Sequence, residues 1–135
     1  MKIRLVMAIF AALLFVAMTE PAFAHHGAAS FDTSHRLTLK GKVVEWFWAN
    51  PHCFLRFDAK DDNGQTVHWA VETQSGTNLL PVGYSKQTFK PGDDVTVTFE
   101  PVRNGRPLGR MVSVILPDGK KLTMDGVPGA PQTQP

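Results

Sequence analysis

Six short segments with strand-like patterns follow one another between residues 37 and 124. The clearest is residues 66–73, where Val67, Trp69 and Val71 alternate with His68 and other polar or small residues. This period of two places successive side chains on opposite faces of a strand. Comparable runs rich in β-branched and aromatic residues recur along the chain. The predicted strands are residues 37–49, 52–59, 66–73, 94–100, 108–116 and 121–124.

Turn-forming residues separate these strands. Asn50-Pro51 ends the first strand, because proline has no N–H to donate to a sheet. Asp62-Asn63-Gly64 predicts a tight turn after the second. Residues 74–89 lack the alternation and predict one or two short helical turns. Gly41, inside the first strand, predicts a bulge or a sharp bend.

The order of these elements predicts an all-β fold. Three strands, an irregular stretch with short helix and then further strands is the order of a small OB-like Greek-key barrel, the oligonucleotide/oligosaccharide-binding type. We therefore expect five to six strands, with a short helical segment between strands 3 and 4. The glycine in the long first strand fits, because one strand must bend to serve both halves of such a barrel. A β-sandwich is the alternative.

Residues 1–24 have the pattern of a cleaved signal peptide. A short basic start is followed by Leu5–Met18, an unbroken apolar run of 14 residues, and Ala22 and Ala24 fit the small-residue cleavage rule. The run is shorter than the roughly 20 residues that a membrane-spanning helix needs. We therefore expect export to the periplasm, a mature chain that begins at His25, and no membrane association after cleavage.

The mature chain is predicted to be one domain. Residues 25–36 form an N-terminal lead-in, residues 37–124 the barrel, and residues 125–135, which lack apolar periodicity, a disordered tail. Removing the charges of residues 1–24 from the 14 basic and 12 acidic residues leaves a formal charge of +1. So small a charge gives no argument for a nucleic-acid partner or an anionic membrane surface. Cys53 is the only cysteine, which excludes an internal disulfide.

Short motifs are distributed over nearly the whole mature chain. They are His25-His26-Gly27, Phe31-Asp32, Leu39-Lys40-Gly41, Asn50-Pro51-His52, Trp69-Ala70-Val71-Glu72, Pro91-Gly92-Asp93, Gly109-Arg110 and Leu116-Pro117-Asp118-Gly119. Through these motifs the chain resembles a family of small exported bacterial proteins catalogued only as a domain of unknown function. The resemblance implies export and a small β-barrel-like fold, and it implies no activity.

The predicted cleavage site makes His25 a candidate metal ligand. An N-terminal histidine offers an α-amine and an imidazole, whose unperturbed pKa values of about 7.7–8 and about 6.5 let both bind a metal near neutral pH. A second imidazole would complete a T-shaped site of three nitrogens, the arrangement known as a histidine brace. Such a site suits Cu(II), which favours tetragonal nitrogen ligation. Zinc would accept the same ligands in tetrahedral geometry.

His52 is the predicted second imidazole, with His26 as a substitute. His52 follows Asn50-Pro51 at a corner between loop and strand. His68 and Glu72 are secondary candidates on one face of strand 66–73, but about 13 Å separates strand residues four apart, so these two cannot bind one ion directly. Three alternatives stay open. The N-terminal histidines bind no metal, His52 forms a hydrogen bond to the backbone of its turn, or His68 is an ordinary strand residue.

Trp46 and Trp48 are the candidates for a different site. They share one face of the first predicted strand, where they would stack on a sugar or base if exposed and join the core if buried.

Cys53 is expected to be a small buried residue.

Two hypotheses for function follow. The first is an exported barrel that binds a transition metal, with copper expected, in periplasmic metal handling. The alternative is a module that binds a non-metal ligand or a protein through the tryptophan face. The chain has no nucleophile motif and no phosphate-binding loop, so no catalytic residue is assigned and an enzyme, including an oxidative copper enzyme, is not the expected function. The expected partner is a metal ion or small ligand, and the sequence identifies no protein partner.

Overall fold

The computed structural model describes residues 30–133 of the chain, in which six strands and one short helical segment form the fold. The observed strands match the predicted ones within about two residues at each end, a normal uncertainty for element boundaries. The elements are β1 (Leu37–Phe47), β2 (Phe54–Lys60), β3 (Thr66–Glu72), α2 (Gly76–Leu79), the 3₁₀ helix η2 (Leu80–Val82), β4 (Asp94–Pro101), β5 (Leu108–Ile115) and β6 (Lys121–Thr123).

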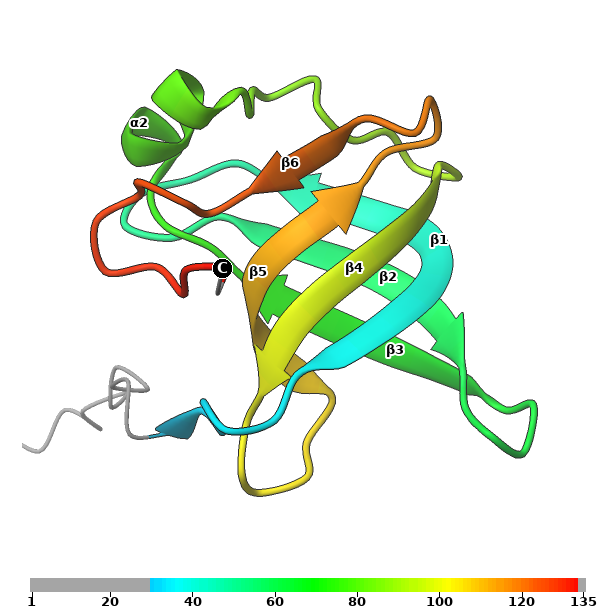
Figure 1. Ribbon diagram of the computed structural model, residues 1–135. Helices are drawn as coiled ribbons and strands as arrows, with labels where there is room; N and C mark the ends of the chain where they lie inside the picture. Colours follow the sequence, from blue (N-terminus) through cyan, green and yellow to red (C-terminus); the bar gives the residue numbers. More distant parts are fainter. Residues whose placement is uncertain (1–29, 134–135) are drawn as a thin grey trace, which may run out of the picture.

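The strands form one closed sheet (Figure 1). Its order is β3-β2-β1-β4-β5-β6, and every pairing in this order is antiparallel. The sheet closes because β3 also pairs with β5, in parallel, so five strands form the barrel and β6 is added along β5. The predicted OB-like Greek-key barrel is therefore confirmed over the β-sandwich, as is the short helical segment between β3 and β4.

β1 serves both halves of the barrel. Residues 37–42 of β1 pair with β4, and residues 41–47 pair with β2. At the overlap, a Cβ on Gly41 would lie 2.3 Å from the carbonyl oxygen of Asp58 and 2.7 Å from the Phe57 ring. Gly41 thus allows the close approach of two backbones, while the bulge lies a little farther along, between Val43 and Glu45.

The core fills the barrel with alternate residues of its strands. Phe57, Phe99 and Met111 are fully buried, and the Phe57 and Phe99 rings meet edge to face with centroids 6.2 Å apart. The segment after β3 covers one end: Ser75 accepts a hydrogen bond from Asn78 N–H and begins α2, whose Leu79 is buried. Figure 1 shows α2 at this end of the barrel.

Residues after β6 differ from the expected disordered tail. Val127 is 2% exposed and packs in the core. Asp125 accepts hydrogen bonds from the backbone and hydroxyl of Thr133, and the Gln132 side chain bonds Gly126, Met124 and Ala130. Buried Val127 and Pro131 and a set of local side-chain bonds fix residues 125–133, and neither produces a periodic sequence pattern.

Among residues 30–133, no helix is long and apolar enough to cross a membrane.

Gly41→Ala is expected to destabilise the barrel by about 2–3 kcal/mol, because the new methyl group meets the Asp58 carbonyl of a paired strand, which cannot move without breaking the ladder. Gly64→Ala is the control: its Cβ would meet nothing within 4 Å, so its cost is the left-handed backbone alone, about 1 kcal/mol. Urea unfolding measures both, and equal losses would contradict the close-approach argument.

Candidate functional site

His52 lies just before β2, in a short extension of the β2–β3 ladder. Cys53 N–H donates to Gln74 O (3.2 Å) and Thr73 N–H donates to Cys53 O (2.9 Å). Next to these bonds, His52 Nδ1 lies 2.8 Å from the backbone oxygen of Thr73. Because a carbonyl oxygen only accepts hydrogen bonds, this contact puts a proton on Nδ1. In the neutral ring with that proton, the lone pair that can bind a metal is on Nε2.

Glu72 lies on the same edge of the His52 ring. Its Oε1 is 3.3 Å from His52 Nδ1, and its side chain is 17% exposed. A carboxylate or carbonyl beside the non-ligating nitrogen of a histidine fixes the direction of the ring and makes it a better metal ligand. Glu72, a secondary candidate from the sequence, therefore contacts His52 at Nδ1, the ring nitrogen away from Nε2.

His68 lies apart from His52. Its Nδ1 is 2.6 Å from Asp58 Oδ1, its partner in register on β2, and its side chain is 80% exposed. Among residues 30–133, no three His, Cys, Asp or Glu side chains are grouped in a way that could hold a metal ion. His25 and His26 lie outside the described residues. The structure thus supplies one oriented imidazole of the predicted site.

The residues that lead into the barrel are anchored. Phe31 is 1% exposed and forms an isolated β-bridge with Val102, while Asp32 N–H donates to Pro101 O at 2.8 Å. Arg103 holds the same stretch, since its Nε donates to Phe31 O (3.2 Å) and its backbone N–H to Ser30 O (3.1 Å). The expected lead-in of small and polar residues therefore contains a core residue, six positions after His25.

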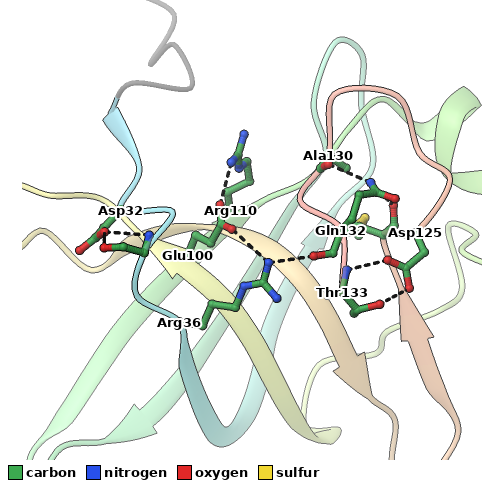
Figure 2. Close-up of polar contacts among 10 residues, drawn as sticks. Asp32, Arg36, Glu100, Arg110, Asp125, Ala130, Gln132 and Thr133 are labelled. Atoms are coloured by element: carbon green, nitrogen blue, oxygen red, sulfur yellow. Dashed lines mark hydrogen bonds and ion pairs between the residues drawn. The ribbon is translucent and has the colours of Figure 1, made fainter. Parts of the chain in front are cut away.

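A buried ion cluster, which the sequence analysis did not find, forms around Glu100 (Figure 2). It lies beside Phe31. Glu100 is 3% exposed and accepts hydrogen bonds from Arg110 Nη2 (2.7 Å) and Arg36 Nη2 (3.4 Å). Arg36 Nη2 also donates to the backbone oxygen of Gln132 at 2.8 Å, which connects the C-terminal stretch. A polar residue at the end of the alternating strand β4 was the only sequence signal for Glu100.

The register of the β3–β5 pairing places Arg110 of this cluster next to Glu72, the residue that contacts His52. Glu72 pairs with Arg110 across β3 and β5, and Arg110 pairs with Glu100 across β5 and β4. Adjacent strands are about 4.8 Å apart, and paired residues point to the same face of a sheet. Six residue steps, the separation of His25 from Phe31, span at most about 20 Å. Phe31, beside Arg110, and His52, beside Glu72, are therefore connected to neighbouring strands of the barrel.

Trp46 and Trp48 are partly buried against the core rather than presented on an open face. Trp46 Nε1 donates to Ser85 O at 2.9 Å, and its ring packs on Phe89 with centroids 5.0 Å apart. Gly76 lies against Trp48, since a Cβ on this glycine would be 2.4 Å from the indole. The stretch that follows β3 thus covers both rings.

Two shallow cavities of about 420 Å³ each lie along β1 on either side of Gly41. Both are bordered by Lys40 and Asp94. None of the residues that the sequence analysis assigned to a site lines either cavity, so neither is associated with the His52 site.

Comparison with known proteins identifies the family. A model of a family of unknown function, DUF6152, matches residues 12–111, and the chain belongs to this family. No curated protein matches the chain.

Two solved structures are similar in shape, both crystal structures of the mitochondrial single-stranded DNA binding protein Rim1 from S. cerevisiae. Their TM-scores are 0.47 and 0.41, with 11% and 13% sequence identity. Each match covers 61% of this chain and 92% of the other. The assignment of an OB-like fold rests on the strand order and pairing described above.

Cys53 is expected to resist alkylation in the folded protein. It is 0% exposed, its Sγ donates to Ala49 O at 3.4 Å, and burial raises the pKa of its thiol. The reactive thiolate is therefore both scarce and covered. Mass spectrometry after iodoacetamide treatment is expected to show labelling only in denaturant. Rapid labelling of the native protein would contradict the burial of Cys53.

Proposed function

We propose that the protein is an exported small β-barrel that binds a transition metal, with copper as the expected metal, in periplasmic metal handling. The ligands are the α-amine and imidazole of the mature N-terminal His25 and Nε2 of His52, with His26 as the substitute imidazole. The observation that carries the proposal is the orientation of His52. Thr73 O and Glu72 occupy its Nδ1 edge, which leaves the Nε2 lone pair for a metal.

The chain length between Phe31 and His25 supports the same assignment. Phe31 is anchored next to Arg110, which pairs with Glu72, whose carboxylate contacts His52. A span of up to about 20 Å is enough for the N-terminus to cross two neighbouring strands that are about 4.8 Å apart. This length supports the proposal that His25 reaches His52, and it does no more than permit it.

Three nitrogen ligands of this kind favour Cu(II), because it prefers tetragonal nitrogen ligation and has the highest affinity in the divalent series. The residues present supply binding and orientation of the metal. No nucleophile or acid–base pair has been assigned in the chain, so metal binding and delivery, rather than catalysis, is the proposed role.

Two other functions have less support. The Rim1 structures belong to a protein that binds single-stranded DNA. We do not extend that function to this chain, because the predicted mature chain has a formal charge of +1 and affinity for nucleic acid depends strongly on positive charge. A ligand-binding tryptophan face is less favoured because the stretch after β3 covers Trp46 and Trp48.

His52→Ala is expected to raise the Cu(II) dissociation constant at least about tenfold, the lower end of what even the partners of metal ligands contribute. His68→Ala is the matched control, since it also removes one imidazole, but from an exposed position on β3 beside Asp58. Isothermal titration of protein cleaved to begin at His25 measures both. Equal affinity in the two variants would contradict the assignment of His52.

A further inference from the structure

A cavity of about 420 Å³ lies on the outer face of the barrel, where β1 changes its partner from β4 to β2. Three lysines border it, Lys40 and Lys42 of β1 and Lys60 of β2. Its volume is typical of clefts that bind small ligands. His52 does not line this cavity, so the cavity is separate from the metal site proposed above.

Asp58 and Asp94, the two carboxylates that border this cavity, each contact another side chain. Lys42 Nζ lies 2.7 Å from Asp94 Oδ1. His68 Nδ1 lies 2.6 Å from Asp58 Oδ1, and the two residues are opposite each other on β3 and β2. One of the three lysines therefore has a carboxylate partner, and the other two do not share it.

Lys40 and Lys60 are two like charges on neighbouring strands. Gly41 pairs with Ala59 across β1 and β2, and continuing this register by one residue puts Lys40 opposite Lys60. Among residues 30–133, neither lysine forms an ion pair, and Lys60 Nζ donates instead to Thr66 Oγ1 at 2.8 Å. Like charges opposite each other in a sheet are destabilising. Local conflicts of this kind are expected at functional sites.

We propose that Lys40, Lys60 and Thr66 bind a phosphate group, either inorganic phosphate or a small phosphate monoester. The two ammonium groups each donate to a phosphate oxygen, and the negative charge between them removes their repulsion. The Thr66 hydroxyl accepts from Lys60 and still has its own proton to donate. Three donors suit the oxygens of a phosphate better than the two oxygens of a carboxylate.

The first test is thermal unfolding of the purified mature protein with inorganic phosphate and without metal. Two charge-assisted contacts at an open site predict a dissociation constant on the order of 1 mM. Phosphate at about 10 mM is then expected to raise the unfolding midpoint by about 5 °C, because it binds the folded state only. Sodium chloride at equal ionic strength is the control. Equal midpoints in the two salts would overturn the proposal.

Lys60→Gln tests the site itself. It is expected to raise the phosphate dissociation constant in isothermal titration about tenfold, because one charge-assisted contact is lost. Without phosphate, the same variant is expected to unfold about 2 °C higher than the native protein, because the like-charge pair is gone. Lys86→Gln is the matched control, since it changes the net charge equally but does not line the cavity. Its phosphate affinity is expected to stay native.

Two further titrations identify the class of anion. Tighter binding of glycerol 3-phosphate than of inorganic phosphate would assign the site to a phosphate monoester, and the reverse order would assign it to phosphate itself. Acetate is expected to bind at least about tenfold more weakly than phosphate, since it has fewer oxygens and less charge. Acetate binding as tight as phosphate binding would overturn the proposal, as would equal losses of phosphate affinity in Lys60→Gln and Lys86→Gln.

Discussion

The parallel pairing of three residues of β3 with three residues of β5 closes the barrel, and the arrangement of the candidate site depends on it. Without this pairing the sheet would end at β3, and Glu72 would lie on a free edge. With it, Glu72 is next to Arg110, and the face that carries His52 is continuous with the face that holds Phe31 and Glu100. Gly41 makes the closure possible, because it lets β1 approach β2 closely where β1 also pairs with β4.

Two separate kinds of contact restrain the residues on this face of the closed barrel. The ladder extension beyond β2 and β3 fixes the His52 ring by a contact between Nδ1 and the backbone oxygen of Thr73. The buried ions hold Arg110 against Glu100, and the Arg110 guanidinium lies over Phe31, the lead-in residue that bridges to Val102.

The barrel was predictable because alternation is a local property. Val67, Trp69 and Val71 predict a strand without any knowledge of its neighbours, and turn residues separate one strand from the next. Phe31 and Val127 were missed as core residues because each is a single apolar position without periodic neighbours. His52 was predicted from its place at the corner after Asn50-Pro51. Its contact with Glu72 was not, because only cross-strand register brings the two together.

The proposed copper site depends most on the free α-amine of His25. The most direct test is Cu(II) titration with electron paramagnetic resonance on protein exported and cleaved to begin at His25, beside a sample with one added residue before it. If His25 binds copper through its amine and imidazole, only the sample that begins at His25 shows a tight one-to-one site with three coupled nitrogens. Weak and equal binding in both samples would contradict it.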